Sequence, residues 1–136
     1  ARLLAAFRGE GDLRARLGHL VGAYLDHLAA DRDLPRLIQR ALLDRDPHLR
    51  RIAGEHLRPL LAALRPLVSG DPSAGVDEII TSIFGALIAP FLYEPLLSDL
   101  FGRDVLAADA LARRRDHVLA LLDLALARLG DAERGD

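Results

Sequence analysis

The sequence contains no cysteine and no methionine. Without a thiol the chain forms no disulfide, gives no thiolate ligand to a metal and has no cysteine nucleophile. The missing initiator methionine predicts that the chain is an excised or processed piece of a longer protein. Lysine and asparagine are absent too, so all 18 basic residues are arginine. This usage indicates a bacterium with GC-rich DNA.

The chain also lacks a strong net charge and a long apolar run. Its formal charge of -2 and pI of about 6.2 provide no general attraction to nucleic acid or anionic lipid. The longest uncharged run, residues 79–93, contains Pro90 and is shorter than the ~20 residues that a membrane span needs. No export signal opens the chain. We therefore expect a cytoplasmic protein without a membrane partner.

Strand-forming residues are scarce, whereas leucine and alanine recur at a spacing near 3.6 residues. This pattern predicts one all-α domain of five to six helices, an orthogonal bundle. Caps and breakers predict a helix tail at 1–8, a helix from the cap Asp12 to about 30, and helices at 34–43 and from Asp46-Pro47. After a loop at 69–75, an apolar helix should begin at Asp77 and be interrupted by Pro90 and Pro95. A final helix at about 107–129 should end in a frayed tail at 130–136. Pro59 should kink or end the helix that contains it.

Two of these helices, residues 76–91 and 107–129, are apolar over more of their circumference than an ordinary surface helix. One interpretation places both at the centre of a single subunit. The other, which we favour, packs each helix against its own subunit on one side and against a second copy on the other. Two helices from each chain would then form a two-fold four-helix dimer interface. The expected interface residues are Ser82, Gly85, Ala89, His117, Val118, Leu121, Leu122, Ala125 and Leu129.

Several sequence runs resemble the C-terminal domain of TetR-family transcriptional regulators over about residues 13–129. These runs are Leu-Val-Gly-Ala-Tyr-Leu at 20–25, Leu-Pro-Arg-Leu-Ile at 34–38, Ser-Gly-Asp-Pro at 69–72, Phe-Gly-Ala-Leu-Ile-Ala-Pro at 84–90 and Arg-Arg-Arg-Asp-His-Val-Leu-Ala-Leu-Leu at 113–122. The helix-turn-helix signature of that family has no counterpart in this chain. No DNA-binding residue is therefore carried over, and we expect this chain alone not to bind an operator.

The resemblance implies a homodimer whose last two long helices form the interface, and a cavity in each subunit for a small, mostly apolar effector. It also implies that residues 1–7 belong to the helix leading to DNA-binding heads, whose spacing on operator DNA changes when the effector binds. The chain would thus be the sensing domain of a repressor. It would have no enzymatic activity and no cofactor.

Candidate cavity residues come from the apolar faces of three predicted helices. They are Tyr24, His27, Ile52, His56, Leu60, Phe84, Ile88 and Phe91. A wall of this composition, mostly apolar with a few polar anchors, is typical of small-molecule pockets. For His27 and His56 the alternative is a buried imidazole that is satisfied by a carbonyl or an acidic neighbour. For the aromatic residues the alternative is plain core packing.

Other chemistry has weaker support. The acid–histidine pairs Asp26-His27, Glu55-His56 and Asp116-His117 are adjacent on helices, so their side chains diverge by about 100 degrees and make poor chelates. No serine lies in a nucleophile elbow and no glycine-rich phosphate loop follows a strand. The run Arg113 to Arg115 fits a solvated helix face or a nucleic-acid patch. A helical-bundle enzyme or metal-binding protein, and a structural interaction domain with a solid core, remain as alternatives.

Overall fold

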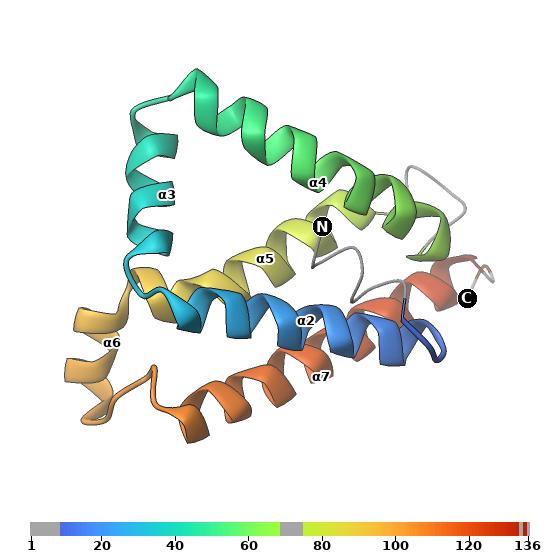
Figure 1. Cartoon of the computed structure of the whole chain (residues 1–136). Helices are drawn as coiled ribbons and strands as arrows, with labels where there is room; N and C mark the ends of the chain where they lie inside the picture. The colour runs from blue at the N-terminus through green and yellow to red at the C-terminus, as the bar shows by residue number, and fades with distance from the viewer. Residues whose placement is uncertain (1–8, 69–74, 134, 136) are drawn as a thin grey trace.

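A computed structural model describes residues 9–68, 75–133 and 135, and within these ranges the fold is all-α, without a strand (Figure 1). Six helices follow one another along the chain. They are α2 (Leu13–Ala30), α3 (Leu34–Leu43), α4 (Pro47–Val68), α5 (Val76–Leu92), α6 (Glu94–Phe101) and α7 (Ala108–Glu133). The helix tail predicted at 1–8 and most of the loop predicted at 69–75 lie outside the described residues.

Side-chain caps lie at the starts of α2 and α4, where the sequence predicts them. The Asp12 carboxylate accepts a hydrogen bond of 2.8 Å from the backbone N–H of Ala15 and caps α2. Asp46 accepts one of 2.9 Å from the N–H of His48 at the start of α4. Pro35 occupies the first turn of α3, where a missing N–H costs no helical hydrogen bond.

Three predicted breakers lie inside helices instead. α4 continues through Pro59 to Val68, and α5 continues through Pro90 to Leu92. α7 continues through Gly130 to Glu133, so the tail predicted to fray from residue 130 is helical for four more residues. A proline removes one backbone hydrogen bond and a glycine costs about 1 kcal/mol relative to alanine. Neither penalty stops a helix when the residues on both sides favour it.

The core lies between α2, α5 and α7, which run side by side in Figure 1 and contact one another in all three pairings. Its buried residues form one main cluster. They are Val21, Leu25, Leu28, Leu87, Ile88, Phe91, Val105, Leu106, Val118 and Leu119. A smaller cluster around Leu17 and Leu122 extends the core toward the start of α2.

α3 and α4 form an arm on one side of this core. α3 packs against α5, while the main helix contact of α4 is with α3. In Figure 1 the arm rises from the end of α2 and α4 returns above α5. α4 therefore depends on α3 for its position more than on the three-helix core.

No single described helix is long and apolar enough to cross a membrane. α5 and α6 together reach the necessary length and hydropathy, but the two helices meet at an angle of 77°.

Candidate functional site

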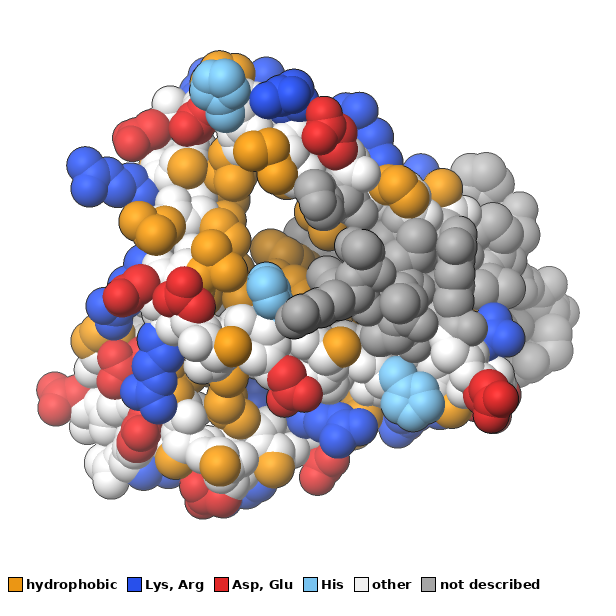
Figure 2. All heavy atoms as spheres, viewed as in Figure 1, with side chains coloured by type: hydrophobic (Ala, Val, Ile, Leu, Met, Phe, Trp, Pro, Cys, Tyr) orange, Lys and Arg blue, Asp and Glu red, His pale blue; other side chains and the backbone are white. Residues whose placement is uncertain are grey.

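An opening lies between α4 and the layer formed by α2 and α5. Figure 2 shows this opening beneath α4, with hydrophobic side chains along the described part of its border. Among the described residues the main helix contact of α4 is with α3, and Arg65 of α4 pairs with Asp77 of α5. This is the region in which the sequence predicts an effector cavity.

The aromatic rings of Tyr24 in α2 and Phe84 in α5 lie side by side and join the two helices. Their ring centroids are 6.0 Å apart with a tilt of 53°, a favourable aromatic arrangement. Phe84 remains 42% exposed although it is a large apolar side chain. Burial raises the pKa of the Tyr24 phenol to about 12, so this hydroxyl stays protonated. Among the described residues none hydrogen-bonds to it, which leaves one neutral donor for another molecule.

The other predicted cavity residues do not form a single wall. His27 is exposed, and Ile52 is about half exposed. Ile88 and Phe91 are buried in the main core cluster, and Phe91 is only 1% exposed. The side chains of His56 and Leu60 lie outside the described residues.

A second feature is an apolar groove of about 300 Å³ between α5 and α7. It is lined by Glu78, Ile79, Ser82, Ile83, Leu121 and Ala125. Ser82, Leu121 and Ala125 are among the predicted interface residues, and Leu124 beyond them is 70% exposed. Gly85 is also exposed, and a Cβ added there would meet no atom within 4 Å. This face is open to a partner of helical shape.

The remaining predicted interface residues are placed differently. Val118 and Leu122 are buried in their own subunit, and Val118 has no exposed surface. Because they expose almost no surface that a second copy could contact, we no longer expect them in the dimer interface. His117 is exposed and Ala89 is half-buried. The side chain of Leu129 lies outside the described residues.

The sequence analysis missed the role of Arg114. Its guanidinium donates hydrogen bonds of 2.9 and 2.6 Å to the carbonyl of Ala86 in α5. In an α-helix this carbonyl would accept from residue 90, but Pro90 has no N–H. The signal was available, since any proline within a helix leaves the carbonyl four residues earlier without its partner.

The two neighbours of Arg114 also have structural contacts. Arg113 forms an ion pair of 2.9 Å with Asp109, and its hydrogen bond and positive charge lower the pKa of that carboxyl. Arg115 lies against Gly22 of α2, where a Cβ would come within 3.4 Å of its Nε atom. The three arginines therefore contact three different elements and do not form one free basic patch.

The part of the chain that the structure describes contains no group of three histidine, aspartate or glutamate side chains that could hold a metal ion. Comparison with known protein families, characterised proteins and solved structures finds no match for this chain. The geometry of the opening and of the α5–α7 groove is therefore the basis for a functional proposal.

Proposed function

We propose that this chain is the effector-binding and dimerisation domain of a TetR-like transcriptional repressor, with its helices arranged as an orthogonal bundle. The observation that carries the proposal is the opening between α4 and the layer of α2 and α5, with its hydrophobic border (Figure 2). The order of helices and breakers in the sequence, which resembles that family, is the second support.

The chemistry of the opening favours a neutral, mostly apolar effector. The exposed part of Phe84 supplies apolar surface, whose removal from water contributes about 25 cal/mol per Å². The Tyr24 hydroxyl supplies one donor for a carbonyl, ether or hydroxyl oxygen of the ligand. A ligand held in this way needs only one acceptor on an otherwise apolar skeleton.

The attachment of α4 suggests how binding is transmitted. Among the described residues the main helix contact of α4 is with α3, so we place the movement in α4. A ligand that touches both α4 and the α2–α5 layer selects the positions of α4 in which both contacts form. In the intact regulator this population shift would change the spacing of the DNA-binding heads.

Dimerisation is the second part of the proposal, and it uses the groove between α5 and α7. The exposed side chains of Ser82, Leu121 and Leu124 together with the bare backbone of Gly85 let another helix approach closely. A symmetric pair of these faces would place α5 and α7 of both copies in one four-helix contact.

The proposed cavity is tested with Nile red, a neutral apolar dye, and with a set of neutral aromatic ligands. Phe84→Ser should weaken dye binding severalfold, because the proposal places this exposed ring in the wall of the cavity. Leu100→Ser is the matched control, since Leu100 is 68% exposed on α6, away from the opening. Equal effects of the two substitutions, or no binding by the unmodified chain, would contradict the proposal.

A further inference from the structure

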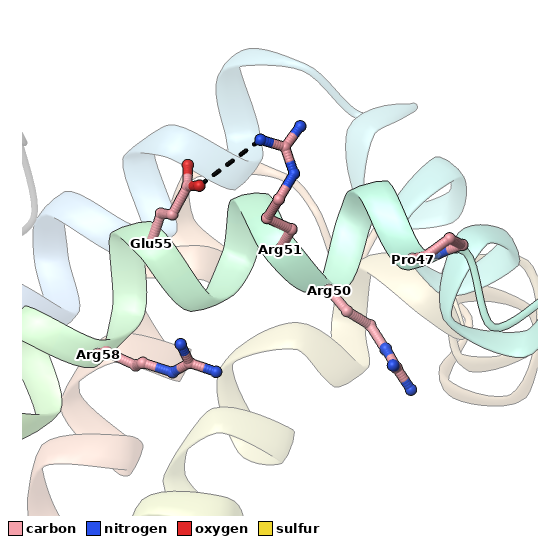
Figure 3. A pocket seen from close by; sticks show the side chains of 5 residues that line it. All are labelled: Pro47, Arg50, Arg51, Glu55 and Arg58. Carbon is pink, nitrogen blue, oxygen red and sulfur yellow. Dashed lines mark ion pairs between the residues drawn. The ribbon is translucent and has the colours of Figure 1, made fainter.

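The polar face of α4 carries a hollow that is separate from the proposed effector cavity. This open hollow has a volume of about 570 Å³ and is lined by Pro47, Arg50, Arg51, Glu55 and Arg58. Figure 3 shows Arg50 and Arg58 extending from one side of the helix, and Arg51 with Glu55 from the other. Three of the five lining residues are thus arginines, and one is a carboxylate.

The positive charge in this hollow is poorly neutralised. Glu55 approaches Arg51 at 3.7 Å, which is an ion pair but is longer than a hydrogen bond. Neither Arg50 nor Arg58 forms an ion pair with any described residue. By contrast, Arg65 further along the same helix contacts Asp77 at 2.6 Å.

Gly54 sets the position of the Arg58 side chain. It lies one helical turn from both Arg50 and Arg58, and a Cβ added there would come within 3.4 Å of the guanidinium carbon of Arg58. The missing side chain lets this arginine fold back over the helix.

The charge of the whole arm agrees with that of the hollow. Residues 34–68, which span α3 and α4, contain seven arginines and three acidic residues. The rest of the chain contains eleven arginines and seventeen acidic residues. A protein of net charge -2 therefore carries a basic arm on an acidic body.

We propose that this hollow binds a small phosphorylated molecule, with Arg50 and Arg58 as its main contacts and Arg51 as a third. Guanidinium groups match the geometry of phosphate oxygens and form two parallel charge-assisted hydrogen bonds to them. The volume lies in the range of small-molecule sites, about 300–1,000 Å³. The site is distinct from the proposed effector cavity, and its test does not depend on that cavity.

Charge distribution favours a small anion over a polymer. A nucleic acid or an anionic membrane would extend beyond α4 and meet the acidic body, whereas a small anion stays within the hollow. Screening at physiological salt limits the repulsion from more distant carboxylates to a length of about 8 Å. The hollow can thus attract a compact anion even though the whole protein is acidic.

Inorganic triphosphate is the probe, titrated into the 136-residue chain by calorimetry at low ionic strength. The double variant Arg50→Gln/Arg58→Gln should bind about tenfold more weakly or worse, because charge-assisted hydrogen bonds are lost. Arg32→Gln/Arg128→Gln is the control, since it makes the same change of charge at two exposed arginines outside the hollow. It should stay within about twofold of the unmodified chain.

Two single variants separate a defined site from diffuse attraction. Glu55→Gln should tighten triphosphate binding severalfold, because it releases Arg51. Gly54→Leu displaces the Arg58 guanidinium without changing charge and favours the helix, so it should weaken binding severalfold. Equal losses in the two double variants, an unchanged affinity in Gly54→Leu, or an absence of triphosphate binding would each overturn the proposal. The proposal would also be overturned if the unmodified chain bound duplex DNA more tightly than triphosphate and the Arg32→Gln/Arg128→Gln control lost this DNA binding.

Discussion

Arg114 of α7 donates hydrogen bonds of 2.9 and 2.6 Å to the backbone carbonyl of Ala86 in α5. Pro90 makes this contact available, because it cannot supply the N–H that would normally pair with Ala86. α5 and α7 are thus joined by a polar contact at the point where the helix has lost an internal hydrogen bond. The defect created by one residue is repaired by another that is 24 positions later in the sequence.

Replacing Arg114 with methionine keeps much of the side-chain length but leaves the half-buried carbonyl unpaired. We expect the free energy of unfolding to fall by about 1–3 kcal/mol, measured by urea denaturation. Arg113→Met, which breaks an exposed ion pair, should leave the free energy of unfolding almost unchanged. In a Pro90→Ala background the restored N–H pairs with Ala86, so Arg114→Met should cost markedly less. An unchanged cost in that background would show that Arg114 acts only through packing.

Tyr24 makes stability depend on pH at the alkaline end. Its folded-state pKa of about 12 exceeds the ordinary tyrosine value of 10.0, so the protonated phenol is favoured by folding. The associated stability is fully present below pH 10 and is lost as the pH rises toward 12. After allowance for partial exposure, the loss should be on the order of 1–2 kcal/mol.

Urea titrations from neutral to alkaline pH check this expectation. Tyr24→Phe should flatten the alkaline loss of stability, whereas Tyr93→Phe, at a position that is 52% exposed, should leave it in place. If both variants keep the same alkaline slope, Tyr24 is not its source.

The parts of the fold that could be predicted are those determined by neighbouring residues. Asp12 and Asp46 cap helices through hydrogen bonds to N–H groups two or three positions away, so the sequence contains both partners. The apolar segment is interrupted at Tyr93, between Pro90 and Pro95, but neither Pro59 nor Pro90 ends its helix. A short sequence window does not include the contact that compensates for a proline inside a helix. For Pro90 that contact is Arg114, which lies in another helix.

The candidate site was harder to predict, because periodicity identifies an apolar face without saying what covers it. Phe84 and Phe91 lie on the same helix and are seven residues apart, yet one is 42% exposed and the other 1%. α3 packs against α5, whereas the main helix contact of α4 among the described residues is with α3. The same limit applies to Val118. When a helix is apolar over most of its surface, the sequence does not tell which of its residues pack in the core of the subunit and which contact a partner.

The contrast between the two phenylalanines gives a third prediction. Phe91→Ala should reduce the free energy of unfolding by about 3–5 kcal/mol, the usual cost of removing a buried aromatic ring. Phe84→Ala should cost much less, because much of the ring is already in water. Thermal and urea unfolding of the two variants measure the difference, and similar losses would mean that Phe84 belongs to the core and not to the opening.

The groove between α5 and α7 gives the last prediction. Light scattering over a concentration series should report a mass near twice the 14.8 kDa of one chain. Leu121→Arg should shift the protein toward monomer, because it places a charge in an apolar contact that would be dry in the dimer. Leu100→Arg is the control, since it alters an exposed leucine on α6 outside the groove. If the unmodified chain is monomeric at all concentrations, the dimer proposal fails. If only Leu100→Arg dissociates the dimer, the copies meet through α6 and the α5–α7 groove is free for another partner.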